Sequence, residues 1–146
     1  MTTLRFSEDP ADTDFDRVHA WLSEHSYWAR GRSAETDRAA MAGSRVFGVF
    51  DESSGLQLGY ARVITDGVTF GWLADVFVDP DARGRGVGVA LVDGITRALE
   101  PLGLKRLVLY TADAQGLYEK SGFRGLPDPE NWMVLPGPGF GSDVHD

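Results

Sequence analysis

Two arginines and three glycines lie together at residues 83–88, in the sequence Arg-Gly-Arg-Gly-Val-Gly. They follow an apolar run at 76–78 that Pro80 ends, and they precede an amphipathic segment at 87–99. A loop of this kind leaves unpaired backbone N–H groups at the start of a helix, where the helix dipole also favours negative charge. Glycines leave these groups accessible, and arginines supply the charge-assisted hydrogen bonds that phosphates prefer. The pattern predicts a binding site for a pyrophosphate.

Two common phosphate-binding loops do not match this stretch. A P-loop requires Lys followed by Ser or Thr after its last glycine, whereas Gly88 is followed by Val89 and Ala90. A dinucleotide-binding fingerprint requires a small residue where Val89 stands, and an acidic residue at the end of the next strand. No acidic residue follows the apolar run at 108–110 in the required way. The pyrophosphate therefore belongs to another class of ligand.

A second motif follows at 114–123, Ala-Gln-Gly-Leu-Tyr-Glu-Lys-Ser-Gly-Phe. It is similar to the Ala-x-x-Leu-Tyr-x-Lys-x-Gly-Phe signature of the GCN5-related N-acetyltransferase (GNAT) superfamily. The loop at 83–88 contains Arg-x-x-Gly-x-Gly, which resembles the coenzyme A pyrophosphate loop of the same superfamily. Because both motifs occur in the expected order and at the expected separation, the sequence is identified as a member of this superfamily.

The resemblance implies transfer of an acetyl group from acetyl-CoA to an amine. The chain has no cysteine and no Gly-x-Ser-x-Gly motif, so a covalent acyl-enzyme has no obvious nucleophile. Direct transfer in a ternary complex is the corresponding expectation. The histidines lack the spacing of metal ligands, so no metal is expected. The alternative is a non-catalytic sensor or regulatory module that binds acyl-CoA without transferring the acyl group.

The resemblance also assigns roles to individual residues. Tyr118, the tyrosine of the second motif, is expected to protonate the departing thiolate. Backbone N–H groups near Phe77 and Val78 are expected to polarise the thioester carbonyl, and the same strand end to pair with the pantetheine arm. Thr111 stands where the family often has Asn, so a side-chain contact to the cofactor there is in doubt. The residues expected to bind the cofactor are Phe77, Val78, Arg83, Gly84, Arg85, Gly86, Val87 and Gly88.

Asp75 is the first candidate for the general base. Alternation along the strand places it on the same face as Phe77, near the expected cleft. Desolvation there would raise its pKa toward a useful value. An equally weighted alternative is that Asp75 pairs with an arginine or caps a loop. Glu24, His25 and a water chain are further candidates.

The acceptor pocket is expected under the first two helices. The residues expected to line it are Trp21, His25, Tyr27, Trp28, Arg30, Trp72 and Trp132. An aromatic cage would suit a cationic acceptor through cation–π attraction. Arg30 and Arg32 would instead suit an acceptor that carries a carboxylate, and packing in the core is the alternative for the aromatic residues. The expected acceptor is a small-molecule amine, an amino-acid-like molecule or a peptide.

Composition agrees with a single globular domain. The chain has 146 residues, of which 42% are hydrophobic and 25% charged. No apolar run approaches the ~20 residues that cross a bilayer, so no membrane partner is expected. Charges within the first ten residues argue against a signal peptide, which makes a cytoplasmic location the expectation. The net charge of −8 argues against nucleic acid as a partner, and the chain is compatible with a homodimer.

Periodicity and turn residues predict a mixed order of elements. Helices are expected at 15–22, from an N-cap at Ser33 to Gly43, at 87–99 and at 114–120. The expected strands are 3–6, 46–50, 58–65, 68–78, 105–110 and 132–135. The fold class is α/β (α+β), with helices flanking a mixed, mostly antiparallel sheet that splays between its fourth and fifth strands. Residues 1–135 are expected to form the N-acetyltransferase domain, and residues 136–146 a flexible tail.

Overall fold

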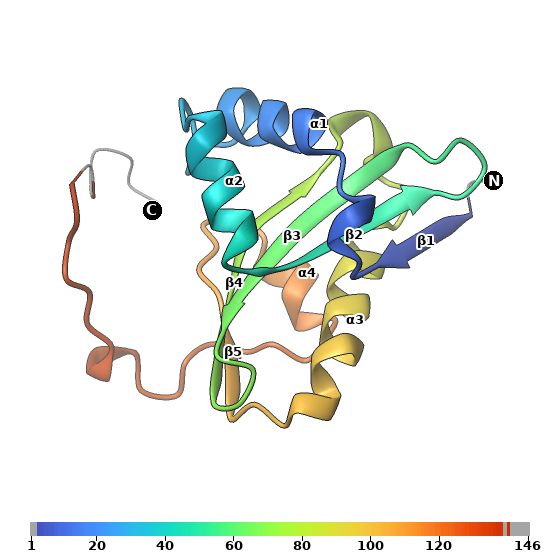
Figure 1. Ribbon diagram of the computed structural model, residues 1–146. Coiled ribbons are helices and arrows are strands. Elements are labelled where there is room, and N and C mark those ends of the chain that lie inside the picture. The colour runs from blue at the N-terminus through green and yellow to red at the C-terminus, as the bar shows by residue number, and fades with distance from the viewer. Residues whose placement is uncertain (1–2, 139, 141–146) are drawn as a thin grey trace.

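A single sheet of five strands organises the computed structural model, which describes residues 3–138 and 140. The strands lie in the order of the sequence, and all neighbours are antiparallel except β4 and β5, which are parallel (Figure 1). Their bounds are β1 (Leu4–Ser7), β2 (Arg45–Asp51), β3 (Gln57–Thr65), β4 (Phe70–Val78) and β5 (Arg106–Val108). The expected fold class, a mostly antiparallel mixed sheet with flanking helices, is confirmed.

The helices begin at local signals in the sequence. Asp14 accepts a hydrogen bond from the Arg17 amide at the start of α1, and Ser33 accepts one from the Thr36 amide at the start of α2. The helices are α1 (Phe15–Ala20), α2 (Ala34–Ala42), α3 (Val87–Leu99) and α4 (Gln115–Glu119), with a π-helical turn η2 (Trp21–His25) and 3₁₀ turns η1 (Pro10–Asp12), η3 (Pro80–Ala82), η4 (Glu100–Leu102) and η5 (Pro129–Asn131). No helix in this part of the chain is long and apolar enough to cross a membrane.

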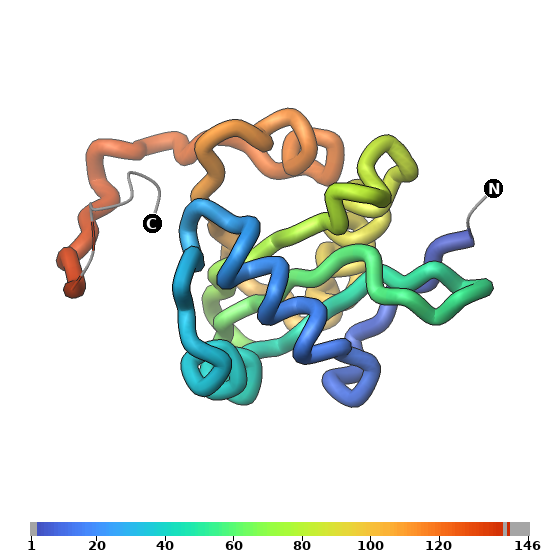
Figure 2. Tube along the Cα trace, turned by 90° about the horizontal axis from the view of Figure 1, so that it is seen from above, coloured from blue at the N-terminus to red at the C-terminus, as the bar shows by residue number. Residues whose placement is uncertain are grey.

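The helices cover both faces of the sheet. Helices α1 and α2 lie on one face, and α3 and α4 lie on the other, as the two views show (Figures 1 and 2). On the first face Val18, Leu22 and Tyr60 are fully buried in one hydrophobic cluster. On the second face, the expected stripe along α3 packs on the sheet and is buried: Val87, Leu91, Ile95 and Leu99. Each fully buried aliphatic side chain contributes about 1.5–3 kcal/mol to folding, so this stripe firmly fixes α3.

Strands β4 and β5 separate toward one end of the sheet. They pair only between residues 70–72 and residues 106–108, while β4 continues to Val78. After Val108 the chain turns away toward α4 (Figure 1). The expected splay between the fourth and fifth strands is therefore present. It places the end of β4 opposite the segment that carries the second sequence motif.

Strand β4 contains one extra residue relative to β3. Tyr60 pairs with Phe77, but Arg62 pairs with Ala74, so the register shifts between them. Asp75 lies in this bulge with a φ of 54°, the only positive φ among the non-glycine residues that the structure describes. A bulge redirects side chains locally and twists the strand. Here it turns Asp75 toward the face that α1 and α2 cover.

The expected strand at 132–135 is wrong. After η5 the described chain has no strand there, and it runs away from the domain (Figure 1). Met133 and Leu135 are almost fully exposed. An apolar run becomes a strand only where a free sheet edge lies within reach, which a local pattern cannot indicate. Of the expected tail at 136–146, residues 139 and 141–146 lie outside the described residues.

Candidate active site

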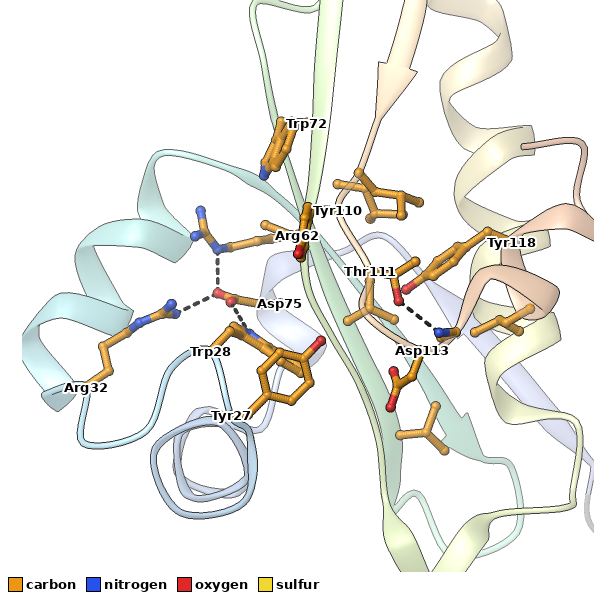
Figure 3. Close-up of a pocket in the computed structure, with 17 residues that line it drawn as sticks. Tyr27, Trp28, Arg32, Arg62, Trp72, Asp75, Tyr110, Thr111, Asp113 and Tyr118 are labelled. Carbon is orange, nitrogen blue, oxygen red and sulfur yellow. Dashed lines mark hydrogen bonds and ion pairs between the residues drawn. The ribbon is translucent and has the colours of Figure 1, made fainter. Parts of the chain in front are cut away.

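A cavity of about 340 Å³ opens where β4 and β5 separate. One wall consists of residues 72–76 and Val78 of β4, and the other includes residues 109–111 and parts of 113–118. Tyr27 and Trp28, from the connection between η2 and α2, close a third side (Figure 3). With Arg62 of β3, which also lines it, the cavity brings together residues from four separate parts of the chain.

The glycine-rich loop leads directly into α3. Gly84 and Gly86 both have a φ of 79°, a left-handed conformation that glycine adopts readily. Gly86 is the N-cap residue of α3, and no side chain caps the helix there. The N–H groups of the first turn are therefore open to an external acceptor. Arg83 and Arg85 are exposed beside them, and Arg85 lies 3.4 Å from Asp51.

The third glycine has a different role from the one its position suggests. A Cβ atom on Gly88 would lie 3.3 Å from Cδ1 of Leu117. Gly88 therefore permits close packing between α3 and α4, which carries Leu117. The sequence argument assigned all three glycines to anion access, but Gly88 also fixes the distance between the two helices.

The end of β4 offers a backbone donor to the cavity. The Asp79 amide donates to the Leu58 carbonyl at 2.8 Å, and Phe77 is paired with Tyr60. Hydrogen-bonded and non-bonded pairs alternate along antiparallel strands. The Phe77 amide therefore points toward β3, and the Val78 amide points into the opening between β4 and β5. Of the two amides near the strand end, that of Val78 faces the cavity.

Tyr118 lies on the opposite wall, and its hydroxyl points into the cavity (Figure 3). Its ring packs edge-on against Phe123, with centroids 5.8 Å apart. Burial, and then the charges of Tyr27 and Asp113, raise the pKa of Tyr118 to about 12. The hydroxyl therefore keeps its proton at neutral pH and can act as a donor.

Thr111 supports the helix that carries Tyr118. Its hydroxyl oxygen accepts a hydrogen bond from the Ala114 amide at 3.1 Å, just before α4. This hydrogen bond fixes the turn that leads into α4, and no side chain caps the helix itself. Thr111 also lines the cavity, so its hydroxyl stands on the wall between β5 and α4.

Asp75 is held by three donors. Trp28 donates its indole N–H to Oδ1 at 2.9 Å, and Oδ2 receives Arg32 Nη1 at 2.8 Å and Arg62 Nε at 2.7 Å (Figure 3). Only 3% of the Asp75 side chain is exposed. Of the two interpretations that the sequence left open, the structure contains the pairing with arginine.

These contacts reverse the expected shift of the Asp75 pKa. Burial alone raises the pKa of a carboxyl group, but hydrogen bonds and charge from Arg32 and Arg62 outweigh it. The pKa of Asp75 therefore lies below its ordinary value. An anion that is stabilised in this way is a poor proton acceptor. The geometry favours a positioning role for Asp75 over a role as general base.

The same carboxylate belongs to a longer buried network. Arg32 Nη1 also donates to Asp37 at 3.1 Å, and Nδ1 of His19 lies 2.6 Å from the other Asp37 oxygen. Burial lowers the pKa of Arg32, but hydrogen bonds to Asp75 and Asp37 more than compensate and raise it above its ordinary value. Arg32 therefore remains a cation at every relevant pH.

The sequence argument missed Arg62, and with it Asp37 and His19 of the same network. Arg62 lies in the middle of β3, between the buried residues Ala61 and Val63. A charged residue inside an apolar central strand is rare unless a partner neutralises it. That exception to the strand pattern was the available signal. The partner is Asp75, on the neighbouring strand.

The expected acceptor-side residues separate into two groups. Tyr27, Trp28, Arg32 and Trp72 line the cavity, whereas the other residues expected there do not. Trp21 packs in the core against Phe77, with ring centroids 5.4 Å apart. His25 and Arg30 are exposed away from the cavity, as is Glu24. The Trp132 ring instead lies 5.7 Å from the Arg106 guanidinium carbon.

Most residues of this site, from Arg62 to Tyr118, fall within a known domain family, whereas Tyr27, Trp28 and Arg32 precede the matched range. Residues 42–125 match the family described as Acetyltransferase (GNAT) domain. A GNAT-family crystal structure from Xanthomonas campestris pv. campestris superposes with a TM-score of 0.87 at 37% identity, covering 96% of this chain and 97% of that one. The Gibberella zeae protein FG08082, whose name places it among acetyltransferases, is 33% identical over 133 residues, which are 79% of this chain and 75% of that protein. Serotonin N-acetyltransferase 2, chloroplastic, of Oryza sativa subsp. japonica is 32% identical over 108 residues, covering 71% of this chain and 54% of that protein.

Proposed function

Because the chain belongs to the GNAT superfamily of acetyltransferases, we propose that it transfers an acetyl group from acetyl-CoA to an amine, directly and within a ternary complex. The observation that carries this proposal is the single cavity that joins Tyr118, the Val78 backbone and the acceptor-side residues. Each of the three parts of the reaction has a group there: one for the carbonyl, one for the leaving sulfur and one for the acceptor.

The proposed donor site runs from the glycine-rich loop to the cavity. The uncapped N–H groups at the start of α3 fit the pyrophosphate, with Arg83 and Arg85 beside them. The edge of β4 that faces the opening fits the pantetheine arm, which can pair with a strand edge as a peptide does. When bound, acetyl-CoA supplies the activated thioester. The Val78 amide is then placed to stabilise negative charge on the carbonyl oxygen.

Tyr118 is proposed to hold the proton that the departing sulfur needs. Its pKa of about 12 lies above the value near 8.5 of an ordinary thiol. Complete proton transfer from Tyr118 to a free thiolate is therefore unfavourable. The phenol is better suited to donate a hydrogen bond as charge develops on sulfur, and to complete the transfer late.

The proton of the amine is proposed to leave to water. The cavity has two carboxylates among the described residues, Asp75 and Asp113. Asp75 is held by its three donors, and Asp113 is exposed to solvent. The donors of Asp75 outweigh its desolvation, and Asp113 lies in solvent, so the protein activates neither carboxylate as a general base. The acceptor therefore reacts as its free amine, which direct transfer allows.

The test is an acceptor panel with acetyl-CoA that follows both free thiol release and the acetylated product. Catalysis predicts thiol release that depends on enzyme and on amine. Heat denaturation in the presence of coenzyme A gives a second readout, because a ligand that binds the folded state at a hundredfold excess over its Kd stabilises it by about 2.7 kcal/mol. Binding without thiol release across the panel would instead support a sensor. An unchanged melting temperature would contradict the proposal that acetyl-CoA is the acetyl donor.

A further inference from the structure

The charged network beside the cavity is arranged in two layers. The acids form the inner layer, since only 3% of the Asp75 side chain and 1% of the Asp37 side chain are exposed. The arginines form the outer layer, with exposed fractions of 21% for Arg32 and 13% for Arg62. The two arginines and two aspartates carry no net charge together, but the arginines are more exposed than the aspartates. A molecule in the cavity meets the guanidinium groups.

Both guanidinium groups keep unused donors. Arg62 donates Nε to Asp75 and Nη1 to Ser44, and Nη2 has no hydrogen-bond partner among the described residues. Arg32 uses only Nη1, which it shares between the two aspartates, so its Nε and Nη2 are without a partner in the same part of the chain. Both arginines line the cavity. This wall therefore offers several N–H donors.

The same wall offers almost no acceptor. Both oxygens of Asp75 are engaged by Trp28 and the two arginines. Trp72 also lines the cavity, and its indole N–H makes no hydrogen bond within the described residues, so it adds a further donor nearby. A ligand group that fits a wall of donors must be rich in acceptors. Carboxylate and phosphate oxygens match a guanidinium fork best.

The opposite end of the cavity has the opposite character. Asp113 lies there with Thr111 and Tyr118, across from Arg32 and Arg62 (Figure 3). The cavity thus has an anion-binding end and an end that carries a carboxylate beside the proposed reaction centre. An acceptor with an amine at one end and an anionic group at the other would match both. Its amine would then face Tyr118 and the opening between β4 and β5.

The net charge of the chain does not decide this question. A charge of −8 attracts cations at long range, which affects the rate of encounter. At physiological ionic strength that field decays over about 8 Å, so contacts inside the cavity determine which group binds. The aromatic side chains Tyr27, Trp28 and Trp72 then contact the body of the acceptor and leave its charged ends to the polar groups.

We propose that the acceptor is an amine that carries an anionic oxygen group, a carboxylate or a phosphate, bound by Arg62 and Arg32. This inference rests on the proposed function and names the substrate class for the same site. Arg62 is the specificity-determining residue, because its Nε holds it beside the bulge of β4 while its Nη2 has no partner among the described residues. Asp75 is a positioning residue that holds both arginines in place.

The test compares acceptors that differ only in the anionic group. For an aromatic and an aliphatic carbon skeleton, three acceptors are compared: the plain amine, the amino carboxylate and the amino phosphonate. Serotonin and 5-hydroxytryptophan form one such pair of plain amine and amino carboxylate. The expected result is a kcat/KM at least tenfold higher for members with the anionic group, and the preferred head group distinguishes carboxylate from phosphate. Equal or faster transfer to the plain amines overturns this inference alone. Transfer to no amine overturns the proposed function.

Variants of Arg62 then test whether this residue causes the preference for anionic acceptors. Arg62→Gln removes the guanidinium, and Arg62→Lys keeps the charge without the fork. The matched control is Arg30→Gln, because Arg30 lies in the connection that also carries Arg32 but is exposed and does not line the cavity. The preference should fall at least tenfold in Arg62→Gln through a higher KM with kcat little changed, and stay unchanged in Arg30→Gln. A loss that is equal for plain and anionic amines overturns the assignment to Arg62.

A binding measurement keeps the test valid if an Arg62 variant folds poorly. N-acetyl-5-hydroxytryptophan and N-acetylserotonin cannot be acetylated again on the same nitrogen, and they differ only in the carboxylate. With coenzyme A present, the carboxylate compound should raise the melting temperature of the parent protein at concentrations where N-acetylserotonin does not. Equal shifts from the two compounds contradict the inference.

Discussion

Arg62 donates its Nε–H to Asp75 at 2.7 Å across two neighbouring strands, although the residue paired with Arg62 in the register is Ala74. The bulge in β4 makes this contact possible, because the extra residue turns the Asp75 side chain toward Arg62. Asp75 in return anchors Trp28 and Arg32, which belong to the connection before α2. One buried carboxylate thus joins the sheet to the segment that closes the cavity.

Asp75→Asn should destabilise the protein while leaving its fold intact. The variant keeps the shape of the side chain but places an uncharged amide against two arginines. Removing one partner of a buried ion pair typically costs about 3–5 kcal/mol. Urea denaturation should show a loss of this order. The matched control is Asp113→Asn, which alters an exposed carboxylate of the same cavity and should change stability by less than about 0.5 kcal/mol.

The pH dependence of the Asp75 contribution follows from the lowered pKa. A carboxyl group with a lowered folded-state pKa stabilises the folded protein above its unfolded pKa, near 3.9, and this contribution is lost as pH falls through the folded value. The stability gap between parent and Asp75→Asn should therefore stay constant from pH 8 to about 5 and narrow below about 4. The parent should likewise show no acidic limb from Asp75 in kcat/KM above about pH 5. A limb near neutral pH that Asp75→Asn abolishes would restore Asp75 as the base.

Tyr118→Phe should reduce turnover without weakening the binding of coenzyme A. The change removes the hydroxyl that faces the cavity and keeps the ring against Phe123. If the hydroxyl acts mainly in the transition state, kcat and kcat/KM fall together, and general acid catalysis is typically worth about 10²–10⁴-fold. We expect at least a tenfold loss in steady-state thiol release, with coenzyme A binding within twofold of the parent by calorimetry. Weaker coenzyme A binding with normal turnover would mark Tyr118 as a binding residue.

Gly86→Ala should distinguish the effect of backbone strain on stability from the effect of the loop on coenzyme A binding. Gly86 has a φ of 79°, and an alanine in this region costs about 1–2 kcal/mol. Gly103→Ala is the matched control, since Gly103 has a φ of 64° beyond the far end of α3. Both variants should lose similar stability, but only Gly86→Ala should lose most of the stabilisation by coenzyme A. Equal responses of both variants to coenzyme A would argue against pyrophosphate binding at this loop.

Tyr60→Phe should stabilise the protein by about 1 kcal/mol. The Tyr60 hydroxyl is fully buried without a hydrogen-bond partner among the described residues, and burial raises its pKa. Leaving a buried polar group unsatisfied costs about 1–3 kcal/mol, which removal of the oxygen should recover in part. Chemical denaturation measures the difference. A loss of stability would show that an ordered water satisfies this hydroxyl in solution.

The sequence by itself determined the loop and the helix that follows it. The helix at 87–99 begins and ends where the pattern predicts, and Ser33 caps α2 as expected. These features depend on contacts within a few residues, namely caps, turns and the spacing of apolar side chains. The two family motifs are local in the same sense. They were sufficient to identify the family and the order of strands around the opening.

Strand pairing at the far edge of the sheet was less predictable. Residues 105–110 were expected as one strand, but only residues 106–108 pair with β4. The apolar run at 132–135 forms no strand at all. A strand exists only with its neighbour, and the neighbour is set by the path of the whole chain. Local alternation therefore predicted more pairing than the tertiary structure provides.

The role of Asp75 was decided by tertiary structure alone. Alternation placed it on the same face as Phe77, but the bulge sets its direction and its partners come from distant segments. Trp28 and Arg32 are 47 and 43 residues away in the sequence, and Arg62 is 13 residues away. Burial by itself raises the pKa of a carboxyl group, and two adjacent cations lower it. The sign of the shift, and with it the choice between a base and an anchor, depends on which side chains folding brings within 3 Å.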